Sequence, residues 1–254
     1  MQEKEKNPEK KGRTARIWLR SFLGGEKCAA CGETETRGLG VLCPACSGKL
    51  DEISAELCPV CRKTVSRCTC VRENMRESGA SGVAKLGFYR SSETGSPLNR
   101  IVYRLKSNRD RLLADELASR LIPGIRLVAA RCGSDLSDAV VTWVPRNRRR
   151  AAREGVDQAK LLAESIADAG GLSCWGLIER RRNRGQAQKK LAAGQRSENV
   201  TGMYAPAGSF LAEGRTVILV DDLITTGSTV SECCRVLSAS GAKRIICACL
   251  AEPY

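Results

Sequence analysis

Apolar and polar positions along the chain follow two different periods from about residue 80 onward. Apolar residues at helical spacing predict three helices, over residues 96–121, 156–169 and 228–240. Short apolar runs predict four strands, over residues 139–144, 175–178, 217–220 and 244–250. Gly241 closes the last helix. Strands that alternate with helices favour an α/β fold, in which helices flank a parallel sheet.

The run VILVDDLITTGST, residues 217–229, joins a predicted strand to the last predicted helix. Asp221 and Asp222 fall at the carboxyl end of that strand, where parallel sheets bind ligands. Two carboxylates there can accept hydrogen bonds from a cis-diol or hold a divalent ion through water. The residues behind them are small, hydroxylated or flexible: Thr225, Thr226, Gly227, Ser228 and Thr229.

A helix N-terminus that follows such a loop offers unpaired backbone amides to an anion, and a glycine lets the chain approach it closely. One end of this stretch therefore suits a diol and the other a phosphate, which predicts a sugar-phosphate site. The alternative is a polar helix cap that merely follows a buried strand. A second ligand-type loop, PRNRRRAAREG at 145–155, follows strand 139–144 and is expected at the same edge of the sheet.

Eight of the fourteen cysteines lie before residue 71. The first four read CAAC, eleven residues, then CPAC. Two CxxC turns can complete a tetrahedron around one ion, so this spacing predicts a structural zinc site in a ribbon or treble clef. Its ligands are Cys28, Cys31, Cys43 and Cys46.

The second four cysteines read CPVC, six residues, then CTC, with a tighter final spacing. They are Cys58, Cys61, Cys68 and Cys70. Disulfides compete with zinc for both sets, and the pairing between the sets can be interleaved, so one or two structural zinc ions are expected. The other six cysteines are interpreted as small buried hydrophobes: Cys132, Cys174, Cys233, Cys234, Cys247 and Cys249.

The composition limits which partners and which catalytic or metal-binding groups the protein can have. The 254 residues include 42 Lys+Arg and 28 Asp+Glu, a net charge of +14 that favours polyanionic partners, with a solvated basic surface as the alternative. Histidine is absent, which excludes an imidazole base or ligand.

No apolar run is long enough for a membrane span, and the charged N-terminus has no apolar signal core, so a cytoplasmic location is expected. The expected divisions are a basic disordered tail at 1–24, a double zinc module at 25–75, and the α/β domain at 80–254.

DDLITTGST closely resembles the ribose-phosphate loop of type I phosphoribosyltransferases, which bind phosphoribosyl pyrophosphate (PRPP) with magnesium. A cysteine-rich zinc module ahead of such a domain resembles the ComF family of competence-associated proteins. Further segments resemble that family over roughly residues 28–252: VYRLK at 102–106, AREGVDQAKLLA at 152–163, RRNRGQAQKKL at 181–191, and the segment that contains Arg196, Asn199, Val200 and Gly202.

The chain also departs from the family pattern at four positions. Glu154 replaces the family's arginine, Val156 its aromatic residue, Asp157 its asparagine and Gly185 its threonine. These departures affect the segments for the pyrophosphate and the flexible loop more than the ribose-phosphate loop.

The resemblance implies a candidate phosphoribosyltransferase whose acceptor the sequence does not name. Asp221 and Asp222 would hold the ribose hydroxyls or the metal, and residues 225–229 the 5-phosphate. The candidates for the pyrophosphate and for a mobile lid are Arg146, Arg148, Arg149, Arg181 and Gln188. The alternative is a non-catalytic protein that handles single-stranded DNA in natural transformation, with other competence proteins as partners. Aromatics are only 4% of residues, so DNA binding would be mostly phosphate-directed and salt-sensitive.

Overall fold

The computed structural model describes residues 27–33, 40–89, 96–107, 110–146, 157–181, 201–207 and 212–253. The expected tail at 1–24 and the candidate residues Arg148, Arg149 and Gln188 lie outside the described residues.

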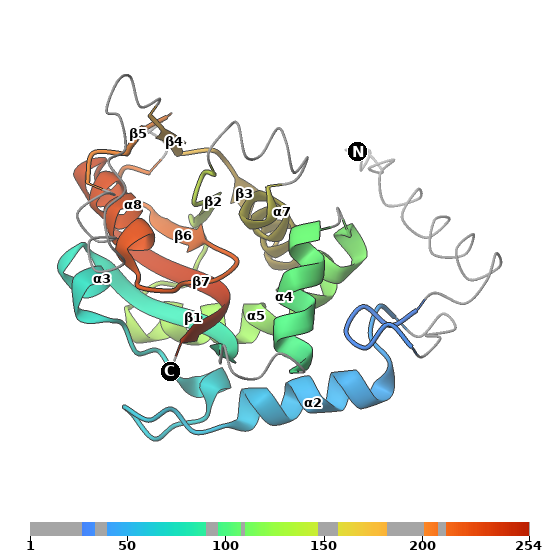
Figure 1. Ribbon diagram of the computed structural model, residues 1–254. Helices are drawn as coiled ribbons and strands as arrows, with labels where there is room; N and C mark the ends of the chain where they lie inside the picture. The colour runs from blue at the N-terminus through green and yellow to red at the C-terminus, as the bar shows by residue number, and fades with distance from the viewer. Residues whose placement is uncertain are drawn as a thin grey trace, which may run out of the picture.

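A five-stranded parallel sheet forms the centre of the protein, with strand order β1-β7-β6-β2-β3 (Figure 1). Its strands are β1 Ala80–Tyr89, β2 Val140–Trp143, β3 Ser173–Cys174, β6 Thr216–Val220 and β7 Arg244–Pro253. A separate antiparallel pair joins β4 Ile178–Arg180 to β5 Tyr204–Pro206. The parallel arrangement predicted from the alternating pattern is confirmed, and it brings the carboxyl ends of β2, β6 and β7 to one edge.

Helices cover both faces of the sheet (Figure 1). The helices are α2 Pro44–Ala55, α3 Glu73–Glu77, α4 Pro97–Ser107, α5 Arg111–Arg131, α7 Gln158–Gly170 and α8 Ser228–Ala239, with a 3-10 turn η1 at Val65–Arg67. Alternate residues of β6 serve the two faces, because successive strand side chains point in opposite directions. Ile218 and Val220 pack with α5 and α7, whereas Val217 and Leu219 pack with α8.

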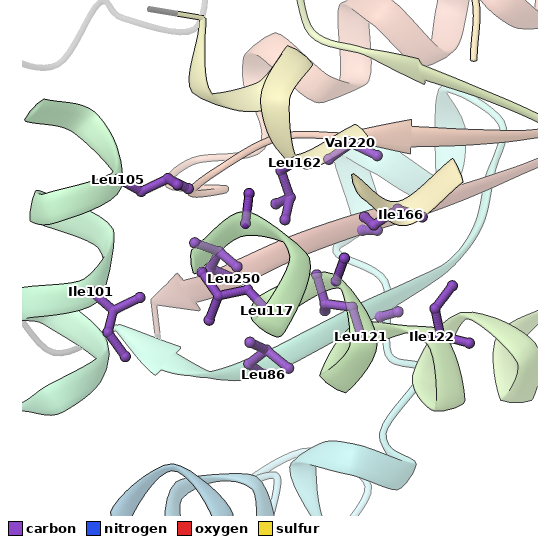
Figure 2. Packing of buried hydrophobic residues seen from close by; sticks show 14 of the residues in the cluster. Leu86, Ile101, Leu105, Leu117, Leu121, Ile122, Leu162, Ile166, Val220 and Leu250 are labelled. Carbon is purple, nitrogen blue, oxygen red and sulfur yellow. The ribbon is translucent and has the colours of Figure 1, made fainter. Parts of the chain in front are cut away.

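The larger core lies between the sheet and helices α4, α5 and α7 (Figure 2). Leu117 and Leu121 of α5 belong to one buried cluster with Leu162 of α7 and Leu250 of β7, and all four are at most 1% exposed. Burying a leucine side chain contributes roughly 1.5–3 kcal/mol. Helix α5 lies so close to β1 that a Cβ on Gly82 would come within 2.4 Å of a Val128 methyl group. The core therefore fixes β1 and β7, and β7 is a neighbour of β6, whose carboxyl end carries the candidate site.

Two of the predicted segments differ in the structure. The helix predicted over 96–121 is divided into α4 and α5, and Asp110 caps α5 by accepting a hydrogen bond from the Leu113 amide at 3.1 Å. The apolar period continues from Leu105 to Leu113 across that division, so periodicity alone does not reveal it. The strand predicted over 175–178 is also wrong, because residues 175–177 connect β3 to β4.

The cysteine-rich segment packs directly against the α/β core. Cys28, Cys43 and Cys46 belong to the same buried cluster as Leu86 and Leu98. The Ser54 hydroxyl of α2 donates to the Leu86 carbonyl at 3.1 Å, and Arg120 of α5 pairs with Asp51 of α2 at 2.6 Å. The second group of cysteines packs around Phe88 at the end of β1. The cysteine-rich segment is thus attached to the sheet at two places.

Candidate phosphate and metal sites

The DDLITTGST loop leaves β6 at the carboxyl edge of the sheet and enters α8. Its first part is anchored to β7, because the Asp221 amide donates to Ala248 at 3.0 Å and the Ile224 amide donates to Ala251 at 3.1 Å. Ile224 is buried, whereas Thr225 and Thr226 are exposed. Gly227 begins α8 as its N-cap, with a left-handed φ of 80°. The loop thus presents hydroxyls and the first amides of α8 beside two aspartates.

Hydroxyl groups order the turn into α8. The Thr226 and Ser228 hydroxyls lie 3.0 Å apart, and the Ser231 amide donates to the Gly227 carbonyl at 2.7 Å. The first amides of a helix have no partner within the helix and carry a partial positive charge. This turn therefore has the geometry of an anion-binding helix N-terminus.

Asp222 lies between the ends of β6 and β2. It is buried, and one of its carboxylate oxygens accepts a hydrogen bond from the Arg146 guanidinium at 3.2 Å. The other oxygen accepts from the Leu223 amide at 2.9 Å. The structure thus brings two predicted site residues together, Arg146 from the arginine loop and Asp222 from the loop after β6.

Asp221 has a different environment from its neighbour. Burial, and then the adjacent Asp222 carboxylate, raise the pKa of Asp221 well above its usual value. Burial also raises the pKa of Tyr204 in β5 to about 12, with further contributions from Cys233 and Asp221. The Asp221 carboxylate thus influences groups of both α8 and β5. A divalent cation beside it would favour its charged form.

Asp157 is a charged residue of this site that the sequence did not assign to it. Its side chain caps α7 by accepting from the Lys160 amide at 3.3 Å. Burial raises the pKa of Asp157, while the Lys160 amide and Arg146 act in the opposite direction. Asp157 stands where the ComF pattern has asparagine, and that departure was the only sequence signal for it.

The β4–β5 pair carries the described part of the candidate lid. Arg180 lies over the Tyr204 ring at 5.7 Å, and the Arg181 amide donates to the Met203 carbonyl at 2.9 Å. The Arg181 side chain is exposed. Glu232 of α8 accepts a hydrogen bond from the Gly202 amide at 2.6 Å. This bond holds the chain just before β5 against α8.

The eight N-terminal cysteines form two separate groups, each able to hold a metal ion. Within each group, the four sulfur atoms lie within 4.8 Å of one another. The groups are Cys28, Cys31, Cys43 and Cys46, and Cys58, Cys61, Cys68 and Cys70. The sets are not interleaved, which answers the question that the sequence left open. All fourteen cysteines are free thiols, which does not support the disulfide alternative.

The environment of Cys28 and Cys61 suits a metal-bound thiolate. The Cys43 amide donates to the Cys28 sulfur at 3.2 Å, and the Ala30 amide donates to the same sulfur at 3.4 Å. Burial opposes ionisation of Cys61, yet hydrogen bonds from the Lys63 backbone and neighbouring cysteines lower its pKa to about 7. Four convergent sulfur ligands fit the tetrahedral preference of zinc. The donor sets thus fit structural sites with every position filled by protein.

Sequence comparison agrees with this fold. Residues 112–253 match the phosphoribosyl transferase domain. The parallel sheet, its flanking helices and the DDLITTGST loop at the carboxyl edge therefore define a phosphoribosyltransferase domain of type I fold, preceded by two cysteine clusters.

Curated relatives narrow the family further. The DNA utilization protein YhgH of Escherichia coli (strain K12) is 28% identical over 227 residues, which cover 88% of this chain and 95% of that protein. The protein of the same name in Salmonella typhimurium is 32% identical over 160 residues, covering 63% and 69%. Competence protein ComFC of Streptococcus pneumoniae is 25% identical over 235 residues, covering 86% and 96%. The chain belongs to the ComF family.

Among the residues that the structure describes, none of the helices has both the length and the apolar character that crossing a membrane requires.

Proposed function

We propose that this protein binds PRPP with Mg²⁺ at residues 221–229 and transfers the phosphoribosyl group to an acceptor. The observation that carries this proposal is the meeting of three features at one edge of the sheet. These features are the carboxylates of Asp221 and Asp222, the hydroxyl-rich N-terminus of α8, and Arg146 from the loop after the neighbouring strand β2. A ribose 5-phosphate with a pyrophosphate needs these three kinds of partner.

Each part of the site has a separate task in this proposal. The amides and hydroxyls of residues 225–229 bind the 5-phosphate. Asp221 and Asp222 accept hydrogen bonds from the ribose hydroxyls or bind Mg²⁺ through water. Arg146 contacts the pyrophosphate, and Arg148, Arg149, Arg181 and Gln188 stay candidates for the same group or for the lid.

The proposed chemistry needs little from the protein beyond positioning and charge stabilisation. The bond between the anomeric carbon and the pyrophosphate oxygen breaks, and both of its electrons leave with the magnesium pyrophosphate. A nucleophile on the acceptor then bonds to that carbon and loses its proton. Fixed carboxylates and arginines around the ribose stabilise the charges that develop. The lid would exclude water, which would otherwise take the place of the acceptor.

Titration of the zinc-loaded protein with magnesium PRPP tests the proposal. The intact protein is expected to bind, and the double variant Asp221→Asn/Asp222→Asn to lose binding. Asp138→Asn is the matched control, since Asp138 is exposed and lies before β2 at the opposite edge of the sheet. Equal binding by the double variant, or no binding by the intact protein, would contradict the proposal. If the intact protein binds PRPP and the double variant does not, the next step is to screen acceptor bases and amines for release of pyrophosphate.

Zinc is the ion that we propose for both cysteine groups, in a structural role. The support is the ligand set itself, because four thiolates leave no open position for a substrate.

A second candidate function is the handling of single-stranded DNA on the same scaffold. The relatives named for DNA utilization and for competence favour it. The net charge of +14 and the exposed Arg181 suit a phosphate backbone, and Trp175, which is 51% exposed, can stack on a base. Proteins of the competence machinery would then be further partners.

Salt separates the two candidate functions. Nonspecific binding of DNA should weaken steeply between low and moderate salt, because it releases counterions. PRPP held in a partly buried site should lose much less affinity. If added salt left the affinities for DNA and for PRPP equally unchanged, this electrostatic account would be contradicted.

A further inference from the structure

A side chain just after the cysteine-rich segment touches the DDLITTGST loop, the phosphate-binding loop of the proposed function. Asn74 lies in α3, the five-residue helix between the second cysteine group and β1. Its amide nitrogen Nδ2 donates to the backbone carbonyl of Thr226 at 3.1 Å. Its oxygen Oδ1 accepts from the Met75 amide at 3.0 Å, which fixes the orientation of the side-chain amide.

This hydrogen bond sets the direction of one peptide group in the loop. In a trans peptide, the carbonyl and the next N–H point in opposite directions. When the Thr226 carbonyl faces Asn74, the Gly227 N–H must therefore face away from α3, on the other side of the loop. A carbonyl turned to that side would place a partial negative charge where an anion is to bind. The orientation of this peptide therefore decides whether the loop attracts or repels phosphate.

Packing at Gly227 supports the same arrangement. Gly227 has a φ of 80°, and a Cβ there would lie 3.1 Å from the Met75 sulfur and 3.3 Å from Asn74 Nδ2. Met75 is fully buried. Helix α3 therefore lies against the back of the loop so closely that only glycine fits without a shift. The glycine is needed for this contact as well as for its backbone conformation.

Helix α3 is itself held on both sides. The Ser238 hydroxyl of α8 donates to the Ser78 carbonyl at 3.3 Å, and the Arg72 guanidinium donates to the Pro253 carbonyl at the end of β7 at 2.9 Å. Only three residues separate Asn74 from Cys70, a member of the second cysteine group. A metal ion on that group would therefore fix the chain just before α3.

We infer that Asn74 is a positioning residue for the phosphate-binding loop, and that through it the second cysteine group sets the geometry of that loop. The inference deepens the proposed function and rests on it only in naming PRPP as the ligand. Asn74 acts on the backbone of Thr226 and Gly227 and needs no contact with the ligand.

Amide hydrogen exchange without ligand tests the positioning directly. Exchange over residues 224–230 is expected to accelerate in Asn74→Ala and in Asn74→Asp. The aspartate keeps the size of the side chain and the acceptor for Met75 but lacks the donor for Thr226. Glu77→Ala is the matched control, since Glu77 is exposed on the same helix. Cys70→Ser, which removes a ligand of the second group, is expected to accelerate exchange in the same peptide.

Titration with magnesium PRPP gives the second measurement. Asn74→Ala is expected to weaken binding by roughly three- to tenfold, the usual effect of one hydrogen bond, while Glu77→Ala binds like the intact protein. Unchanged exchange over 224–230 in both Asn74 variants would overturn the inference, whatever happens to PRPP. Faster exchange in a protein that does not bind PRPP would support the positioning and contradict the proposed function, so the two failures are distinguishable.

Discussion

Arg146 donates a hydrogen bond to Asp222 at 3.2 Å, across the ends of the neighbouring strands β2 and β6. The two residues are 76 positions apart, and only the parallel pairing of these strands brings them together. A cationic and an anionic group therefore meet at the carboxyl edge, next to the N-terminus of α8. The pair orients the Asp222 carboxylate before any ligand arrives.

Replacement of Arg146 tests the importance of this pair. Arg146→Ala leaves the buried Asp222 without its guanidinium partner and removes a candidate contact to the pyrophosphate. A hydrogen bond to a charged group contributes about 1.5–3 kcal/mol, so the affinity for magnesium PRPP should fall by roughly 10- to 100-fold. Arg215→Ala is the control, because Arg215 is exposed just before β6, at the far edge of the sheet. Equal loss in both variants would show a general charge effect instead.

Asp157→Asn should stabilise the protein at neutral pH. Burial raises the pKa of Asp157 in the folded state, so folding favours its protonated form, and the charged form costs stability above that pKa. Asparagine removes this cost and keeps an acceptor for the cap of α7. The free energy of unfolding in urea should be higher for the variant at pH 7, and the difference should shrink as the pH falls through the folded pKa and vanish below the ordinary pKa of an aspartate. A difference that grows on acidification would contradict this account.

The buried ion pair between Lys85 and Glu252 should be important for stability. Lys85 is 1% exposed in its side chain, pairs with Glu252 across β1 and β7, and lies over the Phe88 ring at 5.3 Å, beside the second cysteine group. Lys85→Met leaves a buried carboxylate, which costs about 3–5 kcal/mol. Urea unfolding should show this loss, while the double variant Lys85→Met/Glu252→Met recovers much of it. Lys243→Met, at an exposed position, should have little effect, and an equally small effect of Lys85→Met would contradict the prediction.

Metal analysis tests the separation of the two cysteine groups. The purified protein should contain about two zinc ions per chain, as two four-cysteine structural sites imply. Cys43→Ser/Cys46→Ser and Cys68→Ser/Cys70→Ser should each lose one ion and keep the other. Loss of both ions from either variant would indicate shared ligands. Fewer than fourteen reactive thiols in the unfolded, chelator-treated protein would indicate disulfides.

The sequence predicted the parallel sheet, the helix after the phosphate loop and the eight cysteines that form the two groups, but left open how those cysteines divide between the groups. These features have local signals: a short apolar run, a loop of glycine and hydroxyls, and CxxC spacings. Strand β1 was missed because Gly82, Lys85 and Gly87 interrupt its apolar pattern. Only the tertiary structure explains Gly82 and Lys85. Gly82 leaves room for the close approach of α5, and Lys85 pairs with Glu252.

The site was predictable only in part for the same reason. The sequence placed Arg146 and Asp222 at one edge, but their hydrogen bond depends on the strand order, which periodicity does not give. Asn74 carries no sequence signal at all, because its contact with Thr226 spans 152 residues. Long-range contacts of this kind follow from packing, and they connect the cysteine-rich segment to the phosphate loop.

A structure of the protein with Mg²⁺ and PRPP would test the central proposal most directly. We expect the 5-phosphate against the amides and hydroxyls of residues 225–229, the ribose beside Asp221 and Asp222, and the pyrophosphate towards Arg146. Clear density for PRPP elsewhere would contradict the proposal. One such place is the cavity of about 510 Å³ that Ser134, Asp135 and Lys243 line at the opposite edge of the sheet.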